Sequence, residues 1–261
     1  MREVRRVVIL PARLRASALF LAVLALVLTC ALQASETEIA SREAAEDPDT
    51  ISDARVLADR MLRRQSPGLL LDPERRDRLS QEIGQVLGQL REAYPKTWEV
   101  SARMDHRPGM LLVGLKPALL ATLALAQREN STLTGNAEFD ALNERLGLSD
   151  AQVFRRAGVA ALHFAKYVNL ETASKKYRKI PGVMFAEPDA QLGDGPDIEV
   201  VEVQGIWYVV VRRAWGDCVS GCTHEELSFY SVENGRVHRV EAQQALQEAA
   251  FAKLAQIRGW D

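Results

Sequence analysis

The order of strand-like and helix-like segments between Thr97 and Asp189 constrains the fold more than any other feature of the chain. Helices are predicted from apolar residues three and four positions apart, at 119–127, 136–146 and 170–179. Strands are predicted between Pro and Gly punctuation, at 111–115, 152–156, 160–168 and 183–187. If 152–168 is a hairpin, the order becomes strand, helix, strand, strand, helix, strand. That order is typical of the ferredoxin-like, or split βαβ, domain.

The last of these strands belongs to the most distinctive motif of the chain. A Pro181-Gly182 turn leads into Val183-Met184-Phe185-Ala186-Glu187-Pro188-Asp189. Together with Leu111-Leu112-Val113-Gly114-Leu115, this run resembles the closing and first strands of the prodomain, or propeptide inhibitor, of subtilisin-type serine proteases. The resemblance covers roughly residues 105–190, about a third of the chain. The stretch 118–135, between the first strand and the helix predicted at 136–146, is longer than the corresponding stretch of such prodomains usually is.

The resemblance implies a protein partner, a secreted protease or another envelope protein. In that family the sheet packs on the protease, and the residues after the closing strand lie in its active-site cleft like a product. Partner binding would therefore fall on the closing strand and its end, at Val183, Phe185, Glu187, Pro188 and Asp189. Here the chain runs on into Gly193-Asp194-Gly195-Pro196-Asp197, so a product-like role would require this segment to loop out or to be cut.

The sequence carries no catalytic motif. The 72 residues after Asp189 are too few for a subtilisin-type catalytic domain and hold no Ser/His/Asp motif. His224-Glu225-Glu226-Leu227-Ser228 lacks the second histidine of a zinc-protease motif, and neither a Gly-x-Ser-x-Gly turn nor a glycine-rich phosphate loop occurs. We therefore expect a non-enzymatic chain without catalytic residues and without a cofactor.

The first 34 residues have the composition of an export signal. Five arginines accompany an uncharged, almost wholly apolar run at 16–32, and Ala34 is a residue that signal peptidase accepts. Residues 1–34 are a signal peptide or, because the run approaches the length of a membrane span, an uncleaved signal anchor. Residues 35–50 are acidic and poor in large apolar side chains, as in a flexible linker. We expect an exported protein, periplasmic or secreted, that touches a membrane only through an uncleaved N-terminal segment.

The charge of the remaining chain argues against nucleic acid as a partner. The whole chain carries 33 Lys and Arg against 35 Asp and Glu. Residues 1–34 hold five arginines and one glutamate, so 28 basic and 34 acidic side chains remain, a net charge of −6. Such a surface has no electrostatic footprint for nucleic acid or anionic lipid.

Two further regions flank the ferredoxin-like domain, which we place at 97–192. Two amphipathic helices are predicted within 51–95, the second beginning with Asp72 as N-cap and Pro73. We expect them to pack within the chain as a helical cap, with an interaction arm or a dimer contact as alternatives. Within 193–261, hairpins at Gln204-Gly205 and Asn234-Gly235 give a small antiparallel β module, and a C-terminal helix follows at 241–257. The fold class is α+β.

Between these hairpins lies Trp215-Gly216-Asp217-Cys218-Val219-Ser220-Gly221-Cys222, which resembles a Trp-Gly-Asp-Cys-x-x-Gly-Cys loop of uncharacterised exported bacterial proteins. Removing Cys30 with the signal leaves an even pair in an oxidising compartment, so we expect a Cys218–Cys222 disulfide. A metal site is an alternative, but Cys218, Cys222 and His224 lack a fourth ligand. A redox centre is another, but the parallel βαβ context that activates a thiolate is missing.

These features predict an exported, non-enzymatic protein-binding module related to protease prodomain inhibitors or chaperones. The alternative is an envelope redox or metal-handling protein that uses Cys218, Cys222 and His224. A disulfide without free thiols and without bound metal would favour the first. No feature of the sequence predicts an oligomeric state.

Overall fold

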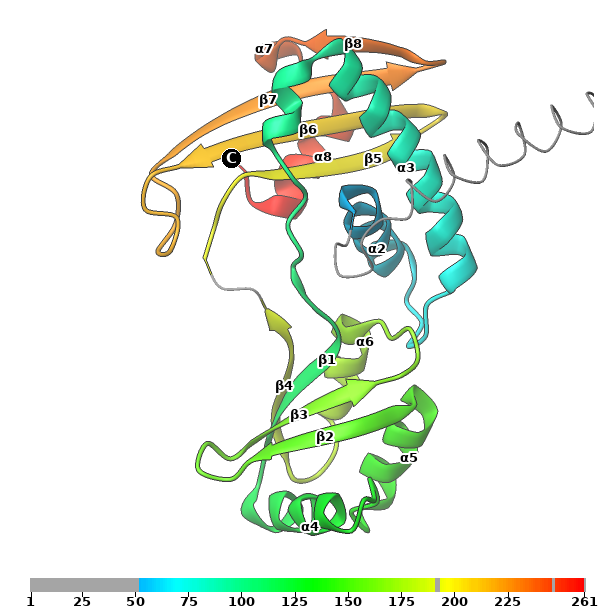
Figure 1. The fold of residues 1–261 in the computed structure, drawn as a ribbon, viewed down its shortest axis with the longest axis vertical. Helices are drawn as coiled ribbons and strands as arrows, with labels where there is room; N and C mark the ends of the chain where they lie inside the picture. Colours follow the sequence, from blue (N-terminus) through cyan, green and yellow to red (C-terminus); the bar gives the residue numbers. More distant parts are fainter. Residues whose placement is uncertain (1–51, 191–192, 246, 261) are drawn as a thin grey trace, which may run out of the picture. The chain divides into compact units, whose positions relative to one another are not determined.

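The computed structural model describes residues 52–190, 193–245 and 247–260 (Figure 1). The signal or signal anchor predicted at 1–34 and the linker predicted at 35–50 lie outside these residues. The described part of the chain is an α+β fold with two four-stranded antiparallel sheets. Within it, no helix is both long enough and apolar enough to cross a membrane.

The first sheet has the strand order β2-β3-β1-β4, with every neighbouring pair antiparallel. Its strands are β1 (His106–Leu115), β2 (Leu148–Phe154), β3 (Val159–Phe164) and β4 (Val183–Ala190). Val113 pairs with Ala160 on one side and Ala186 on the other, which confirms that 111–115 and 183–187 share a sheet. Several predicted bounds were wrong: β1 begins before 111, β2 spans 148–154 rather than 152–156, β3 ends before 168, and β4 extends beyond 187.

Three helices accompany the first sheet, namely α4 (Pro117–Arg128), α5 (Ala137–Leu146) and α6 (Leu170–Tyr177). Asn136 and Asn169 cap α5 and α6 through their side-chain oxygens, and α5 ends at Gly147, whose φ of 70° suits glycine. The long stretch noted at 118–135 contains α4. Alternate residues of the strands bury one face against these helices in a single core.

The second sheet is a meander of β5 (Asp197–Val203), β6 (Ile206–Trp215), β7 (His224–Glu233) and β8 (Arg236–Val240). Its predicted turns are confirmed, because Gln204, Gly205, Asn234 and Gly235 all have positive φ, as a two-residue hairpin turn with this twist requires. The strand β6 extends as far as Trp215, and β7 begins at His224. His224 therefore belongs to a strand and pairs with Trp215.

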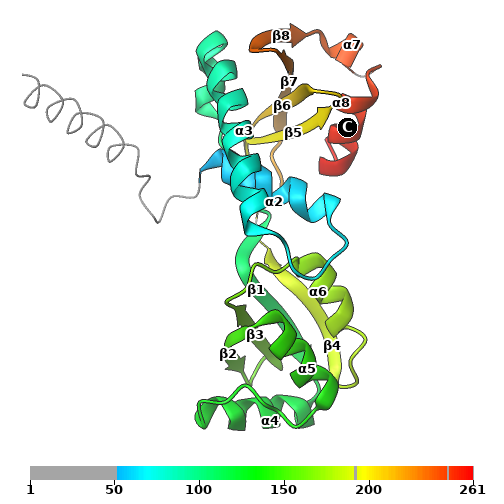
Figure 2. The same cartoon turned by 90° about the vertical axis from the view of Figure 1, so that its right-hand side faces the viewer.

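Helices cover both faces of the second sheet (Figure 2). On one face lie α2 (Asp53–Gln65) and α3 (Pro73–Ala93), followed by the short 3-10 helix η1 (Pro95–Glu99). On the other lie α7 (Ala242–Ala245) and α8 (Ala249–Arg258). The two N-terminal helices thus pack within the chain, on strands more than 100 residues later in the sequence.

The prediction of one continuous C-terminal helix was wrong. The segment forms two helices, α7 and α8, and Ile257 at the end of the predicted helix is 39 % exposed. Ala245 and Phe251 are both fully buried against the sheet. Residues six positions apart lie about 120° apart around a continuous helix, so a break allows both to face the same core.

Polar contacts of α2 join the two sheets. Arg60, buried within α2, forms an ion pair with Asp197 of β5 at 3.0 Å. Directly after α2, the carbonyl of Ser66 accepts a hydrogen bond from the side-chain amide of Asn169 at 3.0 Å, while the side-chain oxygen of Asn169 caps α6. The same helix is therefore held by both halves of the described chain.

Candidate protein-binding surface

One face of the first sheet carries no helix among the described residues (Figures 1 and 2). We call it the open face. Because strand side chains alternate, it is formed by the neighbours of the core residues. Its members are mostly apolar or small, with polar side chains at four positions, two of them carboxylates: Met110, Leu112, Gly114, Asp150, Gln152, Phe154, Val159, Ala161, His163, Phe185 and Glu187. A largely apolar face of this kind is a candidate docking surface.

Phe185 lies directly over Gly114 on the open face. The two residues are paired across β1 and β4, and a Cβ atom built on Gly114 would lie 2.2 Å from Cε1 of Phe185. The absence of a side chain at Gly114 therefore lets the ring of Phe185 lie against the sheet. Phe185 is nevertheless 36 % exposed to solvent. A bulge follows at Leu115, and Met184 beside it is 57 % exposed. Two large apolar side chains are thus accessible on β4, an edge strand of this sheet.

The structure separates the five residues predicted to bind a partner. Phe185 and Glu187 lie on the open face. Val183 packs against the core on the opposite side, and Pro188 faces the same side because it pairs with a core residue of β1. Asp189 forms an ion pair with Arg107 at 3.3 Å. The alternation of the strand therefore leaves two of the five in position for contact through the open face.

A pocket of about 830 Å³ lies at the end of β4, lined by four carboxylate side chains and His106. Three of the carboxylates are already engaged, since Asp105 and Glu171 pair with Arg63 at 2.7 and 3.8 Å and Asp189 pairs with Arg107. Burial, assisted by the charge of Arg63, lowers the pKa of His106, so the ring is held neutral. Burial opposes ionisation of Asp105, but the charges of the surrounding arginines outweigh it and lower the pKa of that carboxyl.

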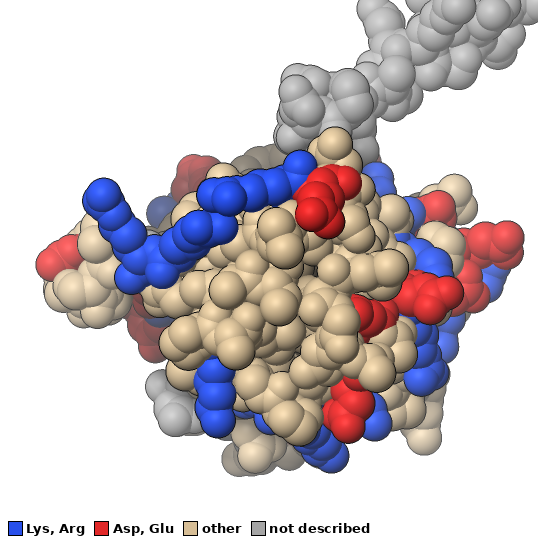
Figure 3. Space-filling view, turned by 90° about the horizontal axis from the view of Figure 1, so that it is seen from below, with Lys and Arg blue, Asp and Glu red and all other residues tan. Residues whose placement is uncertain are grey.

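A second uncharged surface lies over α4. Figure 3 views the end of the molecule at which α4 lies in Figure 1, and uncharged side chains occupy the centre of that view. No charged residue occurs between Lys116 and Arg128, and Leu125 in this stretch is 54 % exposed. Sequence reasoning identified this helix but missed its surface. The uninterrupted absence of charge was the signal, because a solvated helix normally presents a charged face.

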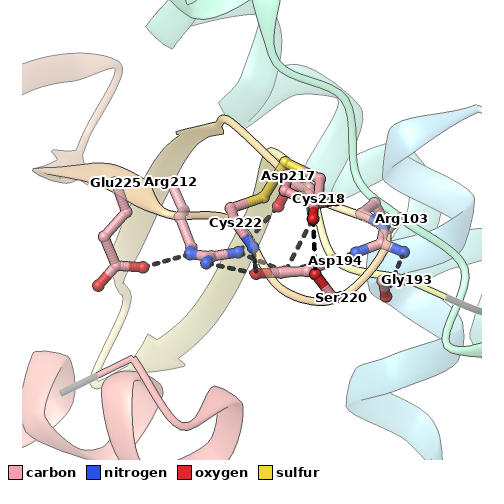
Figure 4. The surroundings of a disulfide bond; sticks show 10 residues. Arg103, Gly193, Asp194, Arg212, Asp217, Cys218, Ser220, Cys222 and Glu225 are labelled. Carbon is pink, nitrogen blue, oxygen red and sulfur yellow. Dashed lines mark hydrogen bonds and ion pairs between the residues drawn. A yellow bond between two sulfur atoms is a disulfide. The ribbon is translucent and has the colours of Figure 1, made fainter.

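The cysteine loop is held by a disulfide and by Asp194, an acidic residue that lies just before β5. Cys218 and Cys222 are bonded to each other, as the sequence predicts. The carboxylate of Asp194 accepts hydrogen bonds from Arg212, and these lower the pKa of Asp194 (Figure 4). His224 stacks on Trp215, with the ring centroids 5.7 Å apart. Among the described residues, no group of three or more His, Cys, Asp and Glu could hold a metal ion.

Comparison with known proteins bears on the first sheet. A family model described as the Fervidolysin N-terminal prodomain matches residues 93–189. The match runs from the end of α3 into β4, so it contains all four strands of the first sheet and its three helices. No curated protein and no solved structure matches the chain. The match supports the resemblance to a subtilisin-type protease prodomain, whereas the resemblance of the cysteine loop remains a prediction.

Proposed function

We propose that this chain is an exported, non-enzymatic protein-binding module whose first sheet docks on a subtilisin-type protease. The observation that carries the proposal is the prodomain match over residues 93–189. A prodomain is a non-catalytic module that inhibits its protease or assists its folding. Export rests on the signal predicted at 1–34.

The physical properties of the open face suit such docking. Phe185 and Met184 expose apolar surface next to each other, and burying a large apolar side chain stabilises a complex by about 1.5–3 kcal/mol. The outer edge of β4 has no partner strand among the described residues. Its backbone groups can therefore pair with a strand or loop of a partner, except that the carbonyl of Ala186 already accepts a hydrogen bond from Arg178 at 2.8 Å.

The segment after β4 limits the mode of binding. Gly193 and Asp194 are held by Arg103 and Arg212, and the chain continues into β5. A product-like insertion into a protease cleft would break these contacts. We therefore propose that the module binds chiefly through the open face, as a chaperone or a weak inhibitor would, rather than through a free end.

The test is a binding and inhibition assay of the purified protein against a panel of secreted subtilisin-type proteases. We expect binding at micromolar concentration, and at least a tenfold loss with Phe185→Asp because a charge would be buried in the contact. The matched control is Val203→Asp, which replaces an apolar residue of similar exposure, 39 %, on the second sheet. Equal losses in both variants, or no binding to any of these proteases, would contradict the proposal.

A further inference from the structure

The segment between the two sheets is fastened to the cysteine loop. It leaves β4 at Ala190 and enters β5 at Asp197, and Asp194 lies within it. The backbone N–H of Asp194 donates to the carbonyl of Cys218 at 2.7 Å. In return, the backbone N–H of Cys222 donates to the carboxylate of Asp194 at 3.3 Å. Both disulfide-bonded residues therefore hold the same residue of the connecting segment (Figure 4).

The fit between the segment and the loop is close. Gly193 has a φ of +84°, and a Cβ atom there would lie 3.1 Å from the carbonyl oxygen of Cys218. The carbonyl of Gly193 accepts a hydrogen bond from Arg103 at 3.1 Å. Arg212 donates to both carboxylate oxygens of Asp194, at 2.7 and 2.8 Å. We call these contacts of 193–194 with Arg212, Cys218 and Cys222 the linker clamp.

The disulfide fixes the loop side of the clamp. It joins residues four positions apart, with their Cα atoms 4.0 Å apart, and so sets the spacing of the Cys218 carbonyl and the Cys222 N–H. Without it, the ring that includes Gly221 would gain backbone freedom and both hydrogen bonds would open more often. The ring is also accessible from solvent, since Val219 within it is 88 % exposed.

We propose that the Cys218–Cys222 disulfide is a redox-sensitive control of the linker clamp. A dithiol reductant attacks one cysteine sulfur, the S–S bond breaks and a mixed disulfide forms; the second thiol of the reductant then releases it. Two electrons pass to the protein, which gains two thiols, and the reductant leaves as a disulfide. Arg212 still holds Asp194 after reduction, so the segment is loosened at one side rather than detached. The connection between the two sheets thereby becomes open to exchange and to proteolysis.

Hydrogen exchange with mass spectrometry on the full chain tests this, with and without dithiothreitol. We expect reduction to speed exchange about five- to tenfold in peptides covering 193–197 and 216–223, as the loss of one backbone hydrogen bond implies. Peptides of β7 beyond Leu227 should be unchanged. The double variant Cys218→Ser/Cys222→Ser should exchange like the reduced protein and should not respond to the dithiol.

The control variant is Val219→Ala, which alters the ring but keeps both cysteines, and it should behave like the original protein in both states. Alkylation of the peptide that contains Cys218 and Cys222 verifies reduction. Exchange at 193–197 that stays within twofold after verified reduction would overturn the proposal. A uniform acceleration across the whole second sheet would overturn it as well, because the disulfide would then be a general stabiliser of the sheet.

Discussion

At the residue scale, Gly114 and Phe185 form a coupled pair. A side chain at Gly114 meets the ring of Phe185, which can move only toward solvent. Gly114→Ala should therefore destabilise the protein by about 1–3 kcal/mol, the usual cost of overpacking. In a Phe185→Ala background the same substitution should cost less than about half as much, because the obstacle is gone. Urea unfolding of the four proteins measures the coupling; equal costs in both backgrounds would show that the ring does not occupy this space.

His106 should make stability depend on pH between neutrality and mild acid. Burial lowers its pKa below 6.5, so the unfolded chain takes up a proton at a pH at which the folded chain does not. The free energy of unfolding should thus fall as the pH falls below about 6.5, by up to about 1.4 kcal/mol per pH unit for one proton. His106→Gln should flatten this slope, whereas His238→Gln, at an exposed position of β8, should leave it unchanged. A slope that survives in the first variant would contradict the assignment.

The role of a residue could be predicted from the sequence only where the number of cysteines or the spacing of residues determines it. The pairing of Cys218 with Cys222 followed from counting cysteines. The placement of Val183 could not follow from alternation alone, because the bulge beside Leu115 turns Val183 to the core side while Phe185 and Glu187 stay on the open face. The ion pairs around Asp194 were also invisible, since Arg212 is separated from it by a complete strand.

At the element scale, Asn169 holds two helices at once. Its oxygen caps α6, and its amide donates to the carbonyl of Ser66 after α2. Asn169→Ala should lower the free energy of unfolding by about 1–3 kcal/mol, since a cap is lost and a partly buried carbonyl loses its donor. Asn169→Asp keeps the oxygen that caps α6 but loses the amide that bonds to Ser66. Its loss of unfolding free energy should therefore be smaller than that of Asn169→Ala and should come from the weakened contact with α2. Thermal or urea unfolding distinguishes them; an equal cost for both variants would show that the amide bond dominates.

Element order was predictable because caps and apolar spacing act locally. Asp72 caps α3 as its sequence position indicates, and Asn136 and Gly147 cap the two ends of α5. Strand lengths were less predictable. The outer parts of β6 and β7 are polar and are held by cross-strand ion pairs, such as Arg212 with Glu225 at 2.7 Å, which apolar alternation does not reveal.

At the scale of the whole described chain, the sequence could not identify what α2 and α3 cover. An apolar stripe requires a partner but does not specify one. The structure places these helices on the second sheet, through contacts between residues more than 100 positions apart. One feature within α2 would have been informative: Arg60 lies among apolar residues, and a buried arginine requires an acidic partner elsewhere in the chain.

The network around Arg60 leads to the last prediction. Asp197 and Glu199 of β5 are buried, and Arg60, Arg64 and Arg258 from two helices neutralise them. Arg60→Met leaves buried carboxylates without one of their cations, so it should destabilise the protein by about 3–5 kcal/mol. Arg213→Met removes only exposed ion pairs, so it should cost about 0–1 kcal/mol.

Arg60 should also determine whether the two sheets unfold together. All four tryptophans lie outside the first sheet, so their fluorescence reports the second sheet and its helices, while hydrogen exchange at β1 and β3 reports the first. In the original protein both probes should give the same midpoint in urea, because α2 is bonded to both sheets. In Arg60→Met the tryptophan signal should change at lower urea than exchange of the first sheet. Coincident midpoints in the variant would show that another contact couples the two sheets.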